Sequence, residues 1–150
     1  MRSFLYPANF TPAEEGGFVV TFRDVPEAIT QGETPSECIE QAVDALDEAM
    51  IGRMNTGTDL PLPSDHERGQ FLIPVPAQTA FKAALYEEIK SQSLSKVQLA
   101  ARLGVDEKEV RRLLDPHHSS KLPRIAEILE RVGKHIVVGV QNDEAILPGT

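Results

Sequence analysis

Seven polar residues in the second half of the chain have side chains that suit contact with DNA. Lysine and arginine neutralise phosphate, and arginine can also donate two hydrogen bonds to a guanine base. The seven residues are Lys96, Gln98, Glu107, Lys108, Arg111, Arg112 and Lys121. The helix caps, the glycine position and the hydrophobic spacing of the surrounding stretch agree with one another, and this agreement favours DNA binding over an ordinary helical hairpin with a charged, solvated face.

The stretch that must position these side chains is SKVQLAARLGVDEKEVRRLL, residues 95–114. Ser95 and Gln98 have the spacing of a capping box, and Gly104 suits the left-handed end of a first helix. Asp106 can cap a second helix that has Glu109 at its third position. The predicted buried side consists of Val97, Leu99, Ala100, Leu103, Val105, Val110, Leu113 and Leu114. We therefore predict a helix-turn-helix whose second helix enters a major groove.

This stretch resembles the helix-turn-helix of the phage-repressor-like family. The resemblance implies that Glu107, Lys108 and Arg112 contact bases. It implies phosphate contacts for the remaining four residues, Lys96, Gln98, Arg111 and Lys121.

Two other groups of reactive side chains are candidates for a catalytic or metal-binding site. Asp44 and Glu48 share a helix face, but so do the acids of any solvated helix, and the first predicted strand carries no carboxylate. His117 and His118 are adjacent, which is not the spacing of two ligands on one side of a helix. We therefore expect no enzyme activity, no metal and no cofactor.

The 150-residue chain carries a net charge of −8 that is divided unequally. Residues 1–76 hold four basic and 13 acidic side chains, a net charge of −9, whereas residues 77–150 hold 11 and 10, a net charge of +1. An acidic front half attracts a basic partner and repels phosphate. With one cysteine, Cys38, no membrane-spanning apolar run and no signal-peptide pattern at MRSFLYPANF, we expect a cytoplasmic protein.

The first half has the pattern of a small sheet covered by a helix. Alternating apolar residues predict strands at 3–10 and 17–23, joined by a turn at TPAEEGG, and a short third strand at 28–32. Thr34, Pro35 and Glu37 begin a helix over 35–54. A loop at 55–69 and a strand at 70–76 complete this domain, which we place at 1–76.

The second half, 77–150, is predicted to be helical. Helices are expected at 78–92 and 122–132, on either side of the helix-turn-helix. The apolar run 135–140, HIVVGV, predicts a short final strand. Such a strand has no sheet to join in a helical domain, so we expect it to pair with a second copy in a homodimer or dimer of dimers.

The order of these elements, together with EGGFVVTFRDVPEAITQGETPSECIEQA, resembles the HicB antitoxins of bacterial type II toxin–antitoxin pairs. The resemblance implies an α+β chain with a partial ribonuclease-H-like domain at 1–76 that binds and blocks a small basic ribonuclease, a HicA-type toxin. It implies that the helix-turn-helix domain at 77–150 binds and represses the operator of its own gene pair. Partner contacts are expected between positions 24 and 37, at Asp24, Glu27, Glu33 and Glu37.

One alternative comes from a different functional class. The chain could be a transcription regulator whose front domain senses a small molecule. The sequence has no Gly-rich phosphate loop, which speaks against this alternative. A short basic reading frame beside the gene would favour the antitoxin, and its absence would favour the sensor.

Overall fold

The structure is a computed structural model that describes residues 1–146, and it has mixed α+β architecture, as predicted. The chain divides into two compact units. The first contains Met1–Pro76 and the C-terminal segment from Val140, and the second contains Ala77–Gly139. None of the helices within residues 1–146 is long and apolar enough to cross a membrane.

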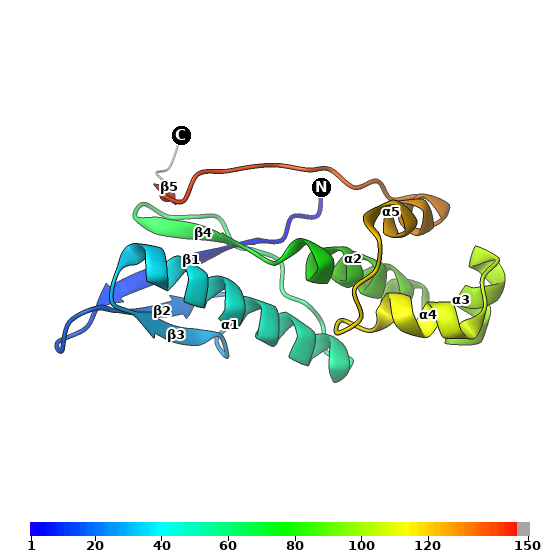
Figure 1. The fold of residues 1–150 in the computed structure, drawn as a ribbon, viewed down its shortest axis with the longest axis horizontal. Helices are drawn as coiled ribbons and strands as arrows, with labels where there is room; N and C mark the ends of the chain where they lie inside the picture. The colour runs from blue at the N-terminus through cyan, green and yellow to red at the C-terminus, as the bar shows by residue number, and fades with distance from the viewer. Residues whose placement is uncertain (147–150) are drawn as a thin grey trace. The chain divides into compact units, whose positions relative to one another are not determined.

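The first unit is built on an antiparallel sheet (Figure 1). Its strands are β1 (Leu5–Pro12), β2 (Phe18–Phe22), β3 (Ile29–Gly32), β4 (Gln70–Pro74) and the two-residue β5 (Ala145–Ile146), in the order β3-β2-β1-β4-β5. β1 and β2 form the predicted hairpin, in which Phe10 lies opposite Val20. Alternation along these strands places Tyr6, Ala8, Val20 and Phe22 in the core.

Helix α1 (Pro35–Asn55) covers one face of this sheet (Figure 1). It begins as predicted, with the Thr34 side chain accepting a hydrogen bond from the Glu37 backbone N–H and with proline at the first position. Its buried residues recur every four positions, at Cys38, Ala42, Leu46, Met50 and Met54. A Cβ at Gly32 would lie 2.9 Å from both the backbone N and the Sγ of Cys38, so glycine permits the close approach of α1 to β3.

The second unit contains four helices: α2 (Ala77–Gln92), α3 (Lys96–Leu103), α4 (Glu107–Leu114) and α5 (Leu122–Arg131). Each contributes apolar side chains to one core, formed by Leu85, Leu99, Ala100, Leu103, Val110, Leu113, Ile125, Ile128 and Leu129. Of the side chains expected to be buried on α3 and α4, Val97 is an exception, because 62% of it is exposed. It precedes Leu99 by two residues, which is about 200° around a helix axis, so it faces away from the core.

The C-terminal strand of the described chain lies at a different position from the one that the sequence predicted, and pairing of residues 135–140 with a second copy stays a prediction. Residues 134–142 form no regular secondary structure, and the described strand is β5, which pairs with β4 antiparallel in the first unit. Gln141 Nε2 also donates a hydrogen bond to the Leu72 carbonyl, at 2.6 Å. The helical unit offers no strand edge, whereas the outer edge of β4 has backbone groups to pair. The segment from Val140 therefore belongs to the first unit and not, as expected, to the second.

Candidate functional site

Helices α3 and α4 are joined by the tight turn that the sequence predicts. The Ser95 side chain accepts a hydrogen bond from the Gln98 backbone N–H at 3.1 Å, and the Gln98 side chain accepts one from the Ser95 N–H at 2.9 Å. Gly104 ends α3 in the left-handed conformation, with φ of 69°. Asp106 then caps α4 by accepting from the Glu109 N–H at 2.7 Å. These local interactions fix where each helix begins and where α3 ends.

The neighbouring helices hold α4 at both ends. The Arg124 guanidinium of α5 donates to the Glu109 carboxylate at 2.6 Å, near the start of α4. The Lys82 ammonium of α2 donates to the carbonyls of Arg112 and Leu113, at 2.8 and 3.3 Å, near its end. α4 is therefore fixed by polar contacts as well as by its buried face.

Four of the seven predicted DNA-binding side chains point into solvent and have no polar partner in the described part of the chain. They belong to Lys96, Lys108, Arg112 and Lys121, all of which are exposed. Among the residues that the structure describes, none of these four side chains forms a hydrogen bond or ion pair. Their charges are therefore available to phosphate or to base edges.

The other three predicted side chains already have partners. Gln98 uses its carbonyl oxygen in the α3 cap. Glu107 and Arg111 form an ion pair one helical turn apart, with the Arg111 Nη2 3.8 Å from the carboxylate. All seven lie on or beside α3 and α4, but the structure gives these three an intramolecular role.

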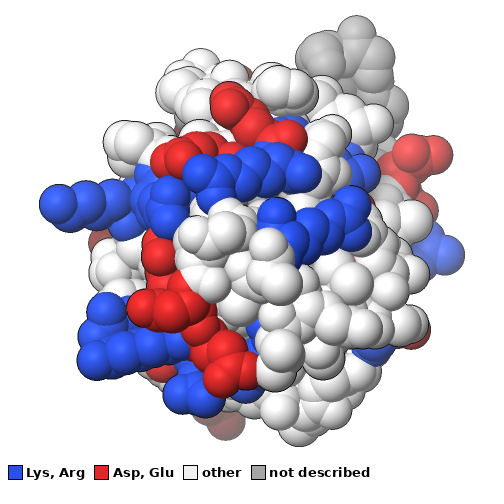
Figure 2. All heavy atoms as spheres, turned by 90° about the vertical axis from the view of Figure 1, so that its right-hand side faces the viewer, with Lys and Arg blue, Asp and Glu red and all other residues white. Residues whose placement is uncertain are grey.

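The charge of the second unit differs in sign from that of the chain. Residues 77–139 contain 11 Lys and Arg against eight Asp and Glu, a net charge of +3. Figure 2 shows basic side chains gathered on the face that lies at the right-hand side of Figure 1, with acidic side chains between them. The unit is therefore locally cationic within an acidic protein.

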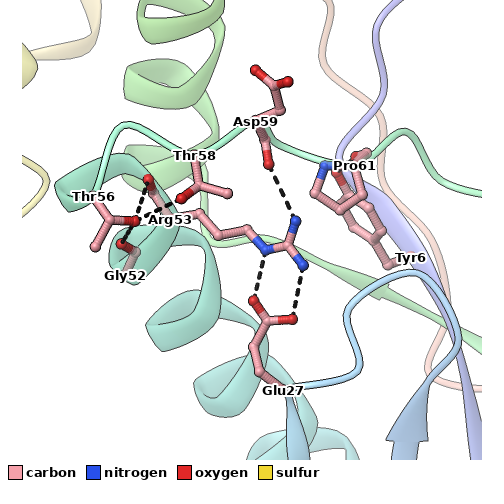
Figure 3. Close-up of polar contacts among 8 residues, drawn as sticks. All are labelled: Tyr6, Glu27, Gly52, Arg53, Thr56, Thr58, Asp59 and Pro61. Atoms are coloured by element: carbon pink, nitrogen blue, oxygen red, sulfur yellow. Dashed lines mark hydrogen bonds and ion pairs between the residues drawn. The ribbon is translucent and has the colours of Figure 1, made fainter.

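In the first unit, two of the four predicted partner-contact residues are used internally. Asp24 accepts hydrogen bonds from the Ser64 N–H and hydroxyl, at 2.9 and 3.0 Å. Glu27 receives two from Arg53 of α1, at 2.6 and 2.9 Å (Figure 3). Arg53 also donates to the Asp59 carbonyl at 3.1 Å. These carboxylates thus fasten the loop after β2 to the last turn of α1 and to the loop that follows α1.

The ion pair between Glu27 and Arg53 also changes how both groups titrate. Hydrogen bonding to Arg53 lowers the pKa of Glu27, and the same contact raises the pKa of Arg53. Partial burial opposes both shifts. Both groups are charged at neutral pH, and both belong to the first unit.

The other two predicted residues, Glu33 and Glu37, line an open groove of about 710 Å³. The β1–β2 turn, β3 and the first turns of α1 form its walls, and Glu14 and Glu15 contribute two further carboxylates. Glu37 also accepts a hydrogen bond from the Glu33 N–H, at 3.2 Å. Four carboxylates, those of Glu14, Glu15, Glu33 and Glu37, therefore line one hollow, which we call the acidic groove.

No metal-binding constellation occurs in the described part of the chain. Within residues 1–146, no three His, Cys, Asp or Glu side chains converge as ligands would. Asp44 and Glu48 lie exposed on α1, and His117 and His118 are exposed in the turn after α4. Cys38 is buried beneath Gly32.

Sequence reasoning missed the residues that hold the candidate sites in place. These are Gln78, Lys82 and Arg124 in the second unit, and Arg53 and Ser64 in the first. Lys82 offered one signal, because it lies beside Phe81 and three residues before Leu85, next to the apolar face of its helix. The others show no pattern, because their partners lie 15 to 42 residues away along the chain.

Comparison with known proteins identifies the family. Residues 5–84 match the profile of a family described as HicB_like antitoxin of bacterial toxin-antitoxin system. The chain is 37% identical over 131 residues to Antitoxin HicB of Escherichia coli (strain K12), which covers 87% of this chain and 95% of that protein. It is 33% identical over 141 residues to Antitoxin HicB 1 of Photorhabdus laumondii, which covers 94% and 90%. The chain therefore belongs to the HicB-like antitoxin family of bacterial toxin–antitoxin systems.

Proposed function

We propose that this antitoxin has two binding activities in separate units. The first unit binds and neutralises a small basic ribonuclease of the HicA type. The second unit binds the operator of its own gene pair through α3 and α4, and thereby represses it. The ribonuclease-H-like character of the first unit and the helix-turn-helix identity of α3 and α4 stay predictions.

The observation that carries the DNA-binding proposal is the set of unpaired cations. Lys96, Lys108, Arg112 and Lys121 are exposed and have no polar partner within residues 1–146. A helical hairpin that served only as structure would gain from pairing these charges with its own acids, as Arg111 and Arg124 do. A gel-shift assay with the DNA upstream of the gene tests the proposal. We expect binding that weakens as salt concentration rises.

The acidic groove supports the proposal for toxin binding. Four carboxylates around one hollow attract a basic protein and speed its association at low salt. We expect Glu33→Lys to weaken neutralisation when the chain is co-expressed with the toxin of the neighbouring gene, as measured by growth. Asp44→Lys is the matched control, because Asp44 is exposed on α1 and does not line the groove. Equal rescue by both variants would exclude the groove from the toxin interface.

The same co-expression experiment addresses the alternative of a small-molecule sensor. A sensor has no toxin to neutralise. Co-expression of the full-length chain with the neighbouring gene would then restore no growth. A growth defect that the full-length chain relieves supports the antitoxin. An unrelieved defect, together with no binding to the neighbour's product, contradicts it.

We further propose a homodimer, or a dimer of dimers, built through residues 135–140. Val137, Val138 and Val140 are 70%, 76% and 98% exposed, and residues 134–142 form no ladder with any described strand. Pairing of this run with its copy would cover the valines and present two α4 helices to two half-sites. Light scattering of Val138→Lys should give a smaller mass than the unsubstituted protein. Equal masses would exclude this interface.

A further inference from the structure

Lys82 is a charged residue placed where charged residues rarely occur. Only 2% of its surface is exposed. Its ammonium has three N–H donors and three acceptors within reach: the carbonyls of Arg112 and Leu113, at 2.8 and 3.3 Å, and the Ser120 hydroxyl, at 3.1 Å. All three acceptors belong to the end of α4 or to the turn that follows it. Lys82 therefore joins α2 to the segment that carries two of the unpaired cations.

Gln78 lies four residues before Lys82 on α2 and forms hydrogen bonds with the same segment after α4. Its Nε2 donates to the Ser120 carbonyl at 2.6 Å, and its Oε1 accepts from the Ser120 N–H at 3.1 Å. Ser120 is thus held by both backbone groups and by its hydroxyl, directly before Lys121. The two residues of α2 fix both ends of the turn at residues 115–120.

Burial of a lysine is less favourable than burial of an apolar side chain of similar volume. Removing an ammonium from water is unfavourable, and no carboxylate forms an ion pair with Lys82 among residues 1–146. Burial lowers the pKa of Lys82, and the nearby charge of Asp115 opposes that shift. A methionine would fill the same volume without this cost. The ammonium instead provides directional contacts, because it interacts favourably with the carbonyl end of α4 and donates hydrogen bonds to the three acceptors named above.

We propose that Lys82, aided by Gln78, is a positioning residue for DNA binding that sets the geometry of Arg112 and Lys121 without touching DNA itself. This inference rests on the proposed binding of operator DNA by α3 and α4. Arg112 is held through its own carbonyl, and Lys121 through its neighbour Ser120. Loss of Lys82 therefore frees the backbone that positions both Arg112 and Lys121.

The test is Lys82→Met in the full-length chain, with duplex DNA from upstream of its own gene. We expect affinity to fall about tenfold, on the order of one to two lost contacts. We also expect the slope of log K against log salt to flatten by about 0.9, because the phosphate contact of Lys121 is lost although Lys82 is not at the surface. A merely structural loss would lower the folded fraction and leave that slope unchanged. Lys90→Met, which removes an exposed charge from the same helix, is the matched control and should leave the slope unchanged.

A double-mutant cycle with Lys121→Ala separates positioning from general damage. If Lys82 acts through Lys121, Lys82→Met changes the salt slope of the unsubstituted protein but adds no further change in the Lys121→Ala background. Additive changes in slope would overturn the proposal. An affinity loss with an unchanged slope in both backgrounds would also overturn it.

Two further outcomes keep the test decisive. If circular dichroism shows that Lys82→Met unfolds the second unit, Gln78→Ala replaces it, because that change removes two bonds to Ser120 and leaves no buried charge. It must flatten the slope in the same way for the proposal to stand. If the unsubstituted chain does not bind the DNA at all, both this inference and the proposed function fail, whereas binding with an unaffected slope in both variants overturns this inference alone.

Discussion

The two units of this protein expose surplus charges of opposite sign. In the first unit, Glu27 and Asp24 are bonded to Arg53 and Ser64, and the carboxylates of Glu33 and Glu37 gather at one groove. In the second, Glu109 and Glu127 neutralise Arg124, while Lys96, Lys108, Arg112 and Lys121 have no polar partner among residues 1–146. Each unit thus pairs part of its charge internally and leaves a surplus of one sign exposed. The sign of that surplus indicates the partner: a cation for the first unit and a polyanion for the second.

The units also differ in how their structure is assembled. The first joins segments far apart in sequence, because the chain leaves the sheet through β4 and returns as β5 after the whole second unit. The second is continuous, and its α3–α4 turn is specified by caps three residues apart. A continuous unit with local caps can keep its surface when the other unit is perturbed, so we expect damage to one unit to leave the binding surface of the other intact.

The largest effect is expected from separate damage to each core. Leu46→Ala empties a fully buried position on α1, and Ile128→Ala does the same on α5. Each should lower the stability of its own unit by about 2–5 kcal/mol. We expect Leu46→Ala to abolish toxin binding first and to spare DNA binding, and Ile128→Ala to do the reverse. Thermal unfolding followed together with both binding assays checks this, and parallel loss of both activities in either variant would show that the units are not independent.

An intermediate effect is expected from the cations of α4. Arg112→Ala removes an unpaired guanidinium and should weaken specific DNA binding by about 1–3 kcal/mol, with relaxed preference at one base of each half-site. Arg111→Ala is the matched control on the same helix, because Arg111 is paired with Glu107 and should cost less. Affinities measured by fluorescence anisotropy on operator duplexes with single base changes give both values. If Arg111→Ala costs more than Arg112→Ala, the distinction between paired and unpaired cations is wrong.

The smallest effect concerns the ion pair of the first unit. Because Arg53 lowers the pKa of Glu27 below its ordinary 4.5, the pair contributes stability above that pH, and the contribution is lost as pH falls through the folded-state pKa. Glu27 is partly exposed, so we expect Arg53→Met to cost no more than about 1 kcal/mol at pH 7. The difference in Tm between variant and unsubstituted protein should shrink as pH is lowered from 6 towards 3. A constant difference would mean that Arg53 acts through packing or through its hydrogen bond to the Asp59 carbonyl, and not through the ion pair with Glu27.

Much of the fold could be predicted because its signals are local. The caps at Thr34, Ser95 and Asp106 are found where their spacing predicted them, since each joins residues three positions apart. The β1–β2 hairpin likewise follows from alternation and a glycine-containing turn. The family resemblance rests on the same front segment and is confirmed by the match over residues 5–84.

Tertiary structure decided the features whose partners are distant in sequence. The run at 135–140 has the composition of a strand, but the strand forms at 145–146, because hydrogen bonding requires an available edge and β4 offers one. No local pattern indicates that Glu27 forms an ion pair with Arg53, 26 residues away. The position of Lys82 beside the apolar face of α2 indicates burial, but not that its acceptors lie at the end of α4. The sequence by itself determined the helices, their caps and the sign of each half's charge, because these depend on neighbours along the chain. Only the folded structure determined which charges are paired and which are exposed, because that depends on neighbours in space.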